Sequence, residues 1–452
     1  MTMNNLRKTF QEIARYPSAI VGAVVILALV GVAIYTMITI PYQKAIELWR
    51  GGEDVWFMNP KNVPPAWFNL FTAKKQPVSF VINDQQGQMT RTVKTHSDGS
   101  QSITITYTFN YAYDYFPQDI LLYFKATFKA KQPFASLVWI TPDGRKINVT
   151  NFGVPNQFTY RVSQDSVLQG KLHGIDPQIA LFADPKSPDP ANPVPLKGTY
   201  QMVVSGVTWE ANSDLSAEFV LHGQVAGLAG TDNYRRDLMV ALLWGTPVAL
   251  AFGLLAAGGT TLLTMVFSAI GAWYGGWVDG LIQRITEVNM VLPFLPILIM
   301  IGTLFSHSIW VILGATVALS IFTAQIKAYR AIFMQVKEST FVEAAKAYGA
   351  SNWRIISLYL IPRMIPTLIP SLVLSVPSFV FLEASLAVLG LGDPTLPTWG
   401  KIIDDAFNQS ALYNGWYYWI LEPAVLLMIT GLAFALLGFA LDRIFNPRLR
   451  EA

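Results

Sequence analysis

The stretch STFVEAAKAYGASNWRIISLYLIPRMIP, residues 339–366, is a charged segment that separates two long apolar runs. Its first half is good helix-forming sequence, and Gly349 follows at a position where the end of a helix favours a positive φ. Ser351 is a candidate N-cap for a second helix. Because proline interrupts helices, Pro362 and Pro366 are expected to turn the chain into the next apolar run. The stretch therefore predicts a compact two-helix hairpin.

The composition indicates an integral membrane protein. Of the 452 residues, 52% are hydrophobic and 13% are charged, and the mean hydropathy is +0.37. Ordinary soluble domains carry about 25% charged residues. The sequence has no cysteine, which excludes disulfides, thiolate metal sites and thiol nucleophiles. The formal net charge of +3 gives no indication of a nucleic-acid partner.

Apolar runs outside residues 41–229 predict a helical polytopic protein with six crossings, since about 20 residues span a bilayer. The first run has 23 residues without a charge, and it lacks the cleavage site of a secretory signal. The crossings are expected at residues 18–40, within 238–278, on either side of residues 305–308 within 288–326, at 364–389 and at 423–441.

Basic residues are distributed unevenly between the loops that these crossings create. With the N-terminus inside, thirteen lysines and arginines fall on the cytoplasmic side, and only Lys401 falls in the short outer connections. Cytoplasmic loops carry such an excess, so we expect both termini inside and residues 41–229 outside. The inner basic residues are Arg7, Lys8, Arg15, Arg284, Lys327, Arg330, Lys337, Lys346, Arg354, Arg363, Arg443, Arg448 and Arg450.

Residues 41–229 are polar, rich in aromatic residues and interrupted by Pro, Gly, Asn and Asp. The segment SITITYTF, residues 102–109, alternates as a half-buried strand does. TPDGRK, residues 141–146, is typical of a hairpin turn. The proline-rich residues 184–198 suit only a loop. We therefore predict one inserted extracytoplasmic β-rich domain, built as a sandwich of short antiparallel strands.

The charged hairpin allows two interpretations. Cytoplasmic loops are often basic only because of membrane topology. However, Ala344, Ala345 and Ala347 leave the first helix without bulk, so another protein surface can approach its backbone closely. The second interpretation makes the hairpin a docking element.

The order of residues in this stretch resembles the EAA motif of ABC importer permeases. That resemblance implies a type I importer permease of six transmembrane helices, in which this loop forms the coupling helix that docks into a cleft of a cytoplasmic ATPase subunit. The family usually has Ile at the position of Tyr359 and Leu at that of Ile361, and both positions stay apolar here. The residues that carry the resemblance, and that it implies as ATPase-coupling residues, are Glu343, Ala344, Ala345, Gly349, Ile361 and Pro362.

Other segments resemble the oligopeptide/dipeptide/nickel branch of the family, in the same order. GTDNYRRD, residues 230–237, is similar to the GTD-x-x-GRD signature, with Arg235 in place of a glycine. The others are YGGWVD at 274–279, EASLAVLGLG at 383–392 and PTWG at 397–400. The expected organisation is a cytoplasmic N-terminus and first crossing at 1–40, the outer insertion at 41–229, and a permease core with five crossings at 230–452.

The resemblance implies a permease subunit of an ATP-driven importer that forms the translocation path for peptides or a similar small solute. The implied partners are a second permease subunit in a heterodimer, two cytoplasmic ATP-binding subunits and an extracytoplasmic solute-binding protein. The implied location is the cytoplasmic (inner) membrane, with several crossings. No cofactor or nucleic-acid partner is expected.

Glu383 is the one acid inside a predicted crossing. Burial of a carboxyl group in a membrane is costly, so Glu383 is expected either to line the translocation path or to hold a neighbouring helix. The sequence shows no nucleophile–base pair, metal-ligand cluster or phosphate-binding glycine loop. The chain is therefore not expected to be an enzyme, and partner subunits would hydrolyse ATP.

Two other functions stay open from the residues alone. A secondary transporter usually has internal repeats and paired broken helices with acids at mid-membrane, and here only Glu383 is available. The other alternative is a membrane anchor whose extracytoplasmic binding domain does the work. Co-purification with an ATPase would separate the importer from both.

Overall fold

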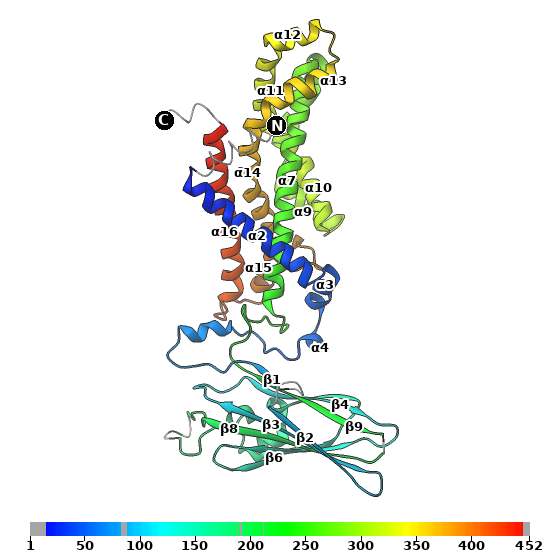
Figure 1. The fold of residues 1–452 in the computed structure, drawn as a ribbon, viewed down its shortest axis with the longest axis vertical. Helices are drawn as coiled ribbons and strands as arrows, with labels where there is room; N and C mark the ends of the chain where they lie inside the picture. The colour runs from blue at the N-terminus through cyan, green and yellow to red at the C-terminus, as the bar shows by residue number, and fades with distance from the viewer. Residues whose placement is uncertain (1–14, 83–87, 188, 190–191, 211, 446–452) are drawn as a thin grey trace. The chain divides into compact units, whose positions relative to one another are not determined.

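The computed structural model describes residues 15–82, 88–187, 189, 192–210 and 212–445. The chain divides into two compact units, a β unit over Gly51–Met239 and a helical unit over Met1–Arg50 and Val240–Ala452 (Figure 1). Both boundaries lie farther along the chain than those expected at residues 40 and 229. Four of the inner basic residues, Arg7, Lys8, Arg448 and Arg450, lie outside the described residues.

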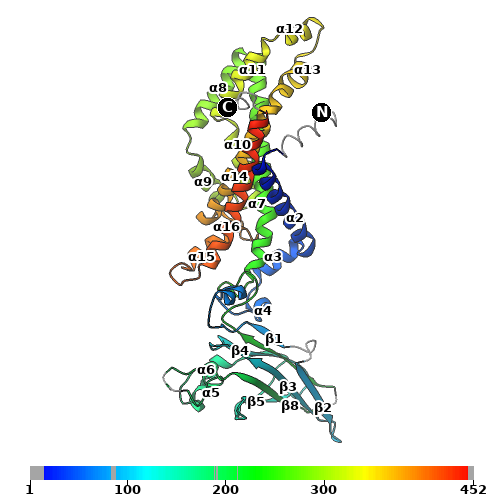
Figure 2. The ribbon, with the colours of Figure 1, turned by 60° about the vertical axis from the view of Figure 1, so that its left-hand side comes forward.

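The β unit contains two antiparallel sheets, with strand orders β1-β9-β4-β7 and β2-β3-β8-β5-β6 (Figure 2). The predicted β-rich region of antiparallel strands is therefore confirmed. Its strands are β1 (Phe80–Ile82), β2 (Met89–Thr95), β3 (Gln101–Tyr111), β4 (Asp119–Thr127), β5 (Phe134–Ile140), β6 (Lys146–Gly153), β7 (Gln157–Arg161), β8 (Gly198–Thr208) and β9 (Asp214–His222). Its short helices are α4 (Glu53–Trp56), η1 (Ala66–Leu70), η2 (Val162–Gln164), α5 (Ser166–Lys171) and α6 (Pro177–Ala180).

Aromatic side chains from both sheets form the core of the β unit. Tyr107 and Phe109 on β3 lie with their ring centroids 5.6 and 5.3 Å from that of Phe219, which belongs to the other sheet. Ile103 and Ile105 are buried on the same face of β3, as the alternating sequence predicts. The two sheets therefore pack face to face as a sandwich.

The helical unit is built from apolar helices joined by short connections. Its helices are α2 (Pro17–Thr39), α3 (Tyr42–Arg50), α7 (Leu238–Tyr274), α8 (Gly276–Val291), α9 (Phe294–Leu304), α10 (Ile309–Ile321), α11 (Ala324–Lys337), α12 (Thr340–Ala347), α13 (Asn352–Ile355), η3 (Ile356–Leu360), α14 (Ile361–Leu386), η4 (Ala387–Leu391), α15 (Trp399–Asn408) and α16 (Tyr418–Phe445). In both views α12 and α13 lie at one end of this unit, and α3 and α15 lie at the other (Figure 1, Figure 2).

Among the described residues, four helices are long and apolar enough to cross a membrane, and the number rises to six if two bent helix pairs each count as one span. The bent pairs are α8 with α9, which meet at 83°, and α10 with α11, which meet at 51°. The sequence places one crossing on either side of residues 305–308, and the two bent pairs lie at these positions. Each pair is interrupted, between Val291 and Phe294 and at residues 322–323, and the sequence did not predict these breaks. The helical polytopic architecture itself is confirmed.

Candidate functional site

The hairpin predicted at residues 339–366 begins with α12 and turns at Gly349. The turn has the hydrogen bonds of a Schellman motif, since the Gly349 N–H donates to Lys346 O at 2.9 Å and the Ala350 N–H donates to Ala345 O at 3.0 Å. Gly349 has a φ of 75°, in the left-handed region expected from the sequence. Ser351 then accepts a hydrogen bond from the Arg354 N–H, so the predicted N-cap is confirmed.

The base of the hairpin is held against the end of α7. The Lys337 ammonium donates to the carbonyl oxygens of Ala272 and Trp273, at 3.0 and 2.9 Å, and so caps the C-terminus of α7. Lys346 on α12 lies 5.0 Å from the centroid of the Trp273 ring. Val342 is fully buried in the apolar cluster below the hairpin. The hairpin is therefore a fixed extension of the helices, not a loose loop.

The outer face of the hairpin is open to solvent. Glu343 and Ala344 are exposed, whereas Ala345 is buried against the base. The side chains next to the Gly349 turn are more exposed still, with Tyr348 92% and Trp353 62% accessible. Sequence reasoning singled out the small residues and missed these two aromatic rings, although their positions on either side of the turn glycine were visible.

The far end of the hairpin differs from the prediction at Pro362. The chain does not turn there, and the helical run that begins at Asn352 continues through α14. A π-helical turn, η3, directly precedes Ile361, and Pro362 occupies the first turn of α14. The helical run therefore continues past Pro362 by way of the π-helical turn that precedes it. Ile361 is half-buried and Pro362 is exposed.

A salt bridge ties the YGGWVD segment to α11. The Arg330 guanidinium donates from Nε to Asp279 Oδ1 at 2.6 Å, and its Nη2 contacts the second carboxylate oxygen. Gly275 and Gly276 have φ values of 64° and 52°, which let the chain pass from α7 into α8. The Arg330–Asp279 salt bridge fixes α8 beside α11, the helix that leads into the hairpin.

Glu383 lies in the packing between α14 and α15. It is buried, and its side chain hydrogen-bonds Thr398, the N-cap of α15. A Cβ added to Gly400 would lie 2.7 Å from the Cα of Ala384. The EASLAVLGLG and PTWG segments are therefore packed directly on each other, and the geometry favours a helix-packing role for Glu383.

In the GTDNYRRD turn of the β unit, Arg235 occupies the position of the glycine in the GTD-x-x-GRD signature, and its contacts show how the turn accommodates it. Arg235 has a φ of 66°, a left-handed conformation that is uncommon for residues other than glycine. Its guanidinium donates to Asn59 O at 2.8 Å and lies 3.2 Å from His222 Nδ1, and Asn59 Nδ2 donates back to Arg235 O. Beside it, Asp232 accepts hydrogen bonds from the backbone and side chain of Arg236.

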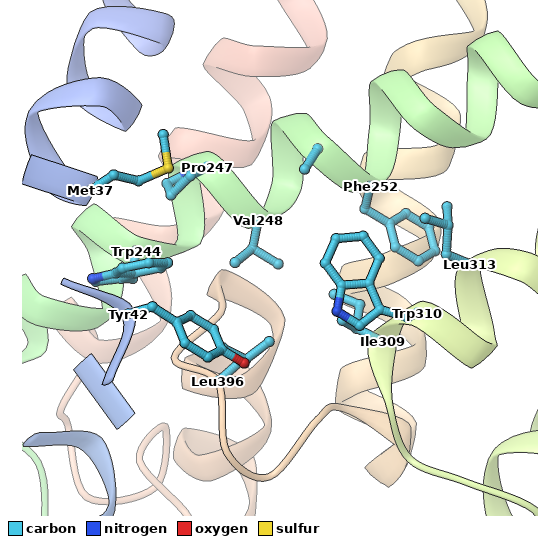
Figure 3. Close-up of a pocket in the computed structure, with 11 residues that line it drawn as sticks. Met37, Tyr42, Trp244, Pro247, Val248, Phe252, Ile309, Trp310, Leu313 and Leu396 are labelled. Atoms are coloured by element: carbon cyan, nitrogen blue, oxygen red, sulfur yellow. The ribbon is translucent and has the colours of Figure 1, made fainter. Parts of the chain in front are cut away.

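An apolar cavity of about 310 Å³ lies between α2, α3, α7 and α10. Figure 3 shows the rings of Tyr42, Trp244 and Trp310 gathered around it. The Trp244 indole N–H donates to Ile40 O at 3.1 Å, which fixes the ring at the end of α2. The lining is almost wholly apolar, and among the described residues that form it Tyr42 carries the one titratable group.

Comparison with known proteins places residues 249–451 in the family described as "Binding-protein-dependent transport system inner membrane component". The chain is 30% identical over 223 residues to the dipeptide transport system permease protein DppC of Bacillus subtilis, covering 49% of this chain and 69% of the relative. A putative peptide transport system permease protein of Brucella suis is 33% identical over 227 residues, with 49% and 74% covered. The glutathione transport system permease protein GsiD of Pectobacterium atrosepticum is 26% identical over 230 residues, with 49% and 73% covered.

Proposed function

The chain belongs to the family of oligopeptide/dipeptide-type ABC importer permeases, and from that membership we propose that it carries a peptide or similar small solute and that its α12–Gly349 hairpin couples this transport to a partner ATPase. As a permease subunit it is not an enzyme, and ATP hydrolysis belongs to partner subunits. Permeases of this family are multi-pass inner-membrane proteins that work with other permease, ATPase and binding-protein subunits.

The exposed face of the hairpin carries the coupling proposal. Tyr348 and Trp353 present two large rings to solvent beside the fixed turn at Gly349, and buried aromatic anchors dominate the binding energy of protein interfaces. The exposed Ala344 has a small side chain that allows close approach to α12, and the exposed Glu343 adds a charge. A cleft on the ATPase that closes over these groups would exclude water from them.

The buried base of the hairpin would carry motion into the membrane helices. Val342 and Ala345 pack in one cluster with Phe333 of α11, Ile356 of η3 and Trp273 of α7. Because packed side chains transmit strain with little compression, a displacement of α12 would move three membrane helices together. Closure of the ATPases would thereby change which side of the membrane the path faces.

The proposed assembly has a second permease as a heterodimeric partner, two cytoplasmic ATP-binding subunits and an outer solute-binding protein. The proposed topology puts both termini in the cytoplasm and residues 41–229 outside. The asymmetry of lysine and arginine in the sequence supports this topology. So does the separation of α12 from α15 at opposite ends of the helical unit (Figure 1).

The topology can be tested with introduced cysteines, because the chain has none of its own. Asn414→Cys in the connection after α15 should react with a membrane-impermeant thiol reagent in intact cells, and Tyr348→Cys should react only after the cells are opened. Labelling of Tyr348→Cys in intact cells would refute the proposed orientation.

Two hairpin variants test the coupling. Gly349→Val forces a β-branched residue into a positive-φ turn, at a cost of about 1–3 kcal/mol, and Glu343→Lys reverses the exposed charge. Both should reach the membrane in normal amounts but co-purify with less ATPase and lose uptake in vesicles.

Matched controls exist at the other end of the unit. Gly415 also has a positive φ, 78°, with nothing within 4 Å of an added Cβ, and Glu47 is an exposed acid on α3. Gly415→Val and Glu47→Lys should therefore retain the ATPase. Normal uptake by both hairpin variants would show that the hairpin is only a well-folded loop.

The secondary-transporter and membrane-anchor alternatives have no support among the relatives compared, whose names are those of transport-system permeases.

A further inference from the structure

The interruption between α10 and α11 is held by side chains from other helices. Thr264 of α7 donates its hydroxyl to Ile321 O at 3.0 Å. The Ser268 hydroxyl of α7 lies 2.7 Å from Thr264 O in its own helix and 3.1 Å from Ile326 O. Asn289 of α8 donates to the carbonyl oxygens of Leu319 and Phe322, both at 2.8 Å. Unsatisfied backbone groups in a membrane cost several kcal/mol each. The carbonyl groups at the end of α10 therefore have side-chain donors, Thr264 and Asn289, from two other helices.

A cavity of about 480 Å³ lies beside this break, between α7, α10, α11 and α14. Hydroxyl and amide groups dominate its polar lining, and every described residue that lines it is uncharged. Broken membrane helices are tolerated where they line a water-filled cavity, and this cavity has the volume of an ordinary small-ligand pocket, about 300–1,000 Å³. Its polar lining includes Thr260 and Thr261 from α7, Ser320 and Thr323 at the break, Gln325 from α11 and Ser375 from α14.

Part of this polar lining is already used within the protein. The Tyr329 hydroxyl pairs with Ser371 Oγ at 3.0 Å, and Ser375 donates to Leu372 O at 2.8 Å. Among the described residues, Thr260 Oγ1 is enclosed and has no hydrogen-bond partner. Thr323 precedes α11 as its N-cap, but its side chain makes no capping bond. The Thr260 oxygen is enclosed and a solute cannot reach it, so Thr323 supplies the unused hydrogen-bonding group at the cavity wall.

We propose that this cavity binds the uncharged hydrogen-bonding part of the transported solute, the amide groups of a peptide backbone or the hydroxyl groups of a saccharide. The proposal rests on the proposed transport function. Hydroxyl and carboxamide groups both donate and accept, so the wall recognises neutral polar groups without fixing their order. Glu383 and Asp279 do not line the cavity. The cavity would therefore offer no oppositely charged side chain to a charged end of the solute.

A thiol-labelling experiment on the assembled transporter in proteoliposomes tests the proposal. Thr323→Cys and Gln325→Cys should react with a small hydrophilic methanethiosulfonate reagent, because thiols react as thiolates, which need water. Thr303→Cys is the membrane control, since Thr303 is exposed on α9 and bonds its own helix at Ile299 O. Thr316→Cys is the buried control, since Thr316 is fully buried and does not line the cavity. Both cavity variants should react about tenfold faster than either control.

Two probes then identify the source of the bound groups. A mixture of di- to hexa-alanine and a mixture of malto-oligosaccharides are each added before the reagent. Slower labelling with the peptides assigns the cavity to amide groups, and slower labelling with the saccharides assigns it to hydroxyl groups. The proposal is overturned if the cavity variants react no faster than the controls. It is also overturned if neither mixture slows their reaction. ATPase co-purification is measured on the same preparations, so a failure of coupling is recognised separately from a failure of the cavity.

Discussion

The two units of this protein distribute apolar and polar side chains in opposite ways. The β unit buries its rings, with Trp139 and Tyr107 fully enclosed. The helical unit turns apolar side chains outward, as at Leu27 and Ile38 of α2, which are 69% and 75% accessible. Its hydroxyl groups instead lie inside, at Thr264 and around the break between α10 and α11. Water is the solvent of the first unit and lipid that of the second, so the same side chains have different effects in each.

This difference decides what a substitution should change. In the β unit burial of apolar area supplies the folding free energy, so the loss of a core ring should lower stability. In the helical unit lipid is as apolar as a leucine side chain, and helix association depends on close packing and hydrogen bonds. A steric change there should matter more than a lost methylene group. Four predictions, ordered by expected effect, test this contrast.

Trp139→Ala should have the largest effect. The indole N–H donates to Leu181 O at 3.0 Å, and the ring packs 5.2 Å from Phe182. Truncation of a buried tryptophan costs about 3–5 kcal/mol, which should appear as a lower free energy of unfolding in residues 51–239 expressed alone. Trp209 is 52% accessible, so Trp209→Ala should cost much less. Equal losses would show that the sandwich core does not dominate stability.

Acid should destabilise the β unit through His222. Burial and then the Arg235 cation lower the pKa of His222 to about 3, while the unfolded chain binds the proton near pH 6.5. Above about pH 6.5 the ring is neutral in both states, and the fold has its full stability with respect to this group. As the pH falls from 6.5 toward 3, the unfolded chain binds a proton that the folded protein does not. The free energy of unfolding should therefore decrease, by about 3 kcal/mol at pH 4.5.

The test is the pH dependence of denaturant unfolding in wild type and His222→Asn, which has no titrating ring. Burial raises the pKa of Asp119 and Asp232, which gives the opposite slope, but these carboxyl groups are common to both proteins. The difference between the two curves therefore reports His222. Parallel curves between pH 4 and 7 would show that the ring is not buried in its neutral form.

Gly245→Ala should give an intermediate effect in the helical unit. A Cβ at Gly245 would lie 2.1 Å from Trp399 Cδ1, and the Trp399 indole also donates to Leu242 O at 2.9 Å. Overpacking of this kind costs about 1–3 kcal/mol and should lower the melting temperature in detergent. Gly258 lies on the same helix with nothing within 4 Å of an added Cβ, so Gly258→Ala should leave the melting temperature unchanged or raise it. Equal behaviour of the two variants would contradict the packing described.

Thr264→Val should have the smallest effect. It removes the hydroxyl that donates to Ile321 O, and hydrogen bonds between membrane helices are worth about 0.6 kcal/mol on average. Thr303→Val, which removes a bond only within its own helix, is the matched control. A loss above about 2 kcal/mol for Thr264→Val would mean that the break, not apolar packing, limits the stability of this unit.

Much of the local structure follows from short stretches of sequence. The alternation from Ile103 to Phe109 is enough to predict a strand with one buried face, because side chains alternate along a strand. Gly349 is enough to predict where α12 ends, because few other residues adopt a positive φ easily. The length of the apolar runs is enough to predict the helices, because lipid requires long apolar segments.

Partners far apart in the chain decided the rest. Thr264 and Asn289 satisfy carbonyl groups across 57 and 30 residues, so no local pattern shows that residues 322–323 interrupt a helix. Arg235 keeps a positive φ, a conformation typical of glycine, because its guanidinium hydrogen-bonds Asn59 O and lies beside His222 Nδ1. Sequence alone thus determined the type of the elements and the extent of the apolar runs, through periodicity and composition. Only the tertiary structure decided where helices break and which polar groups remain free, because each depends on a hydrogen-bond partner that the fold brings close.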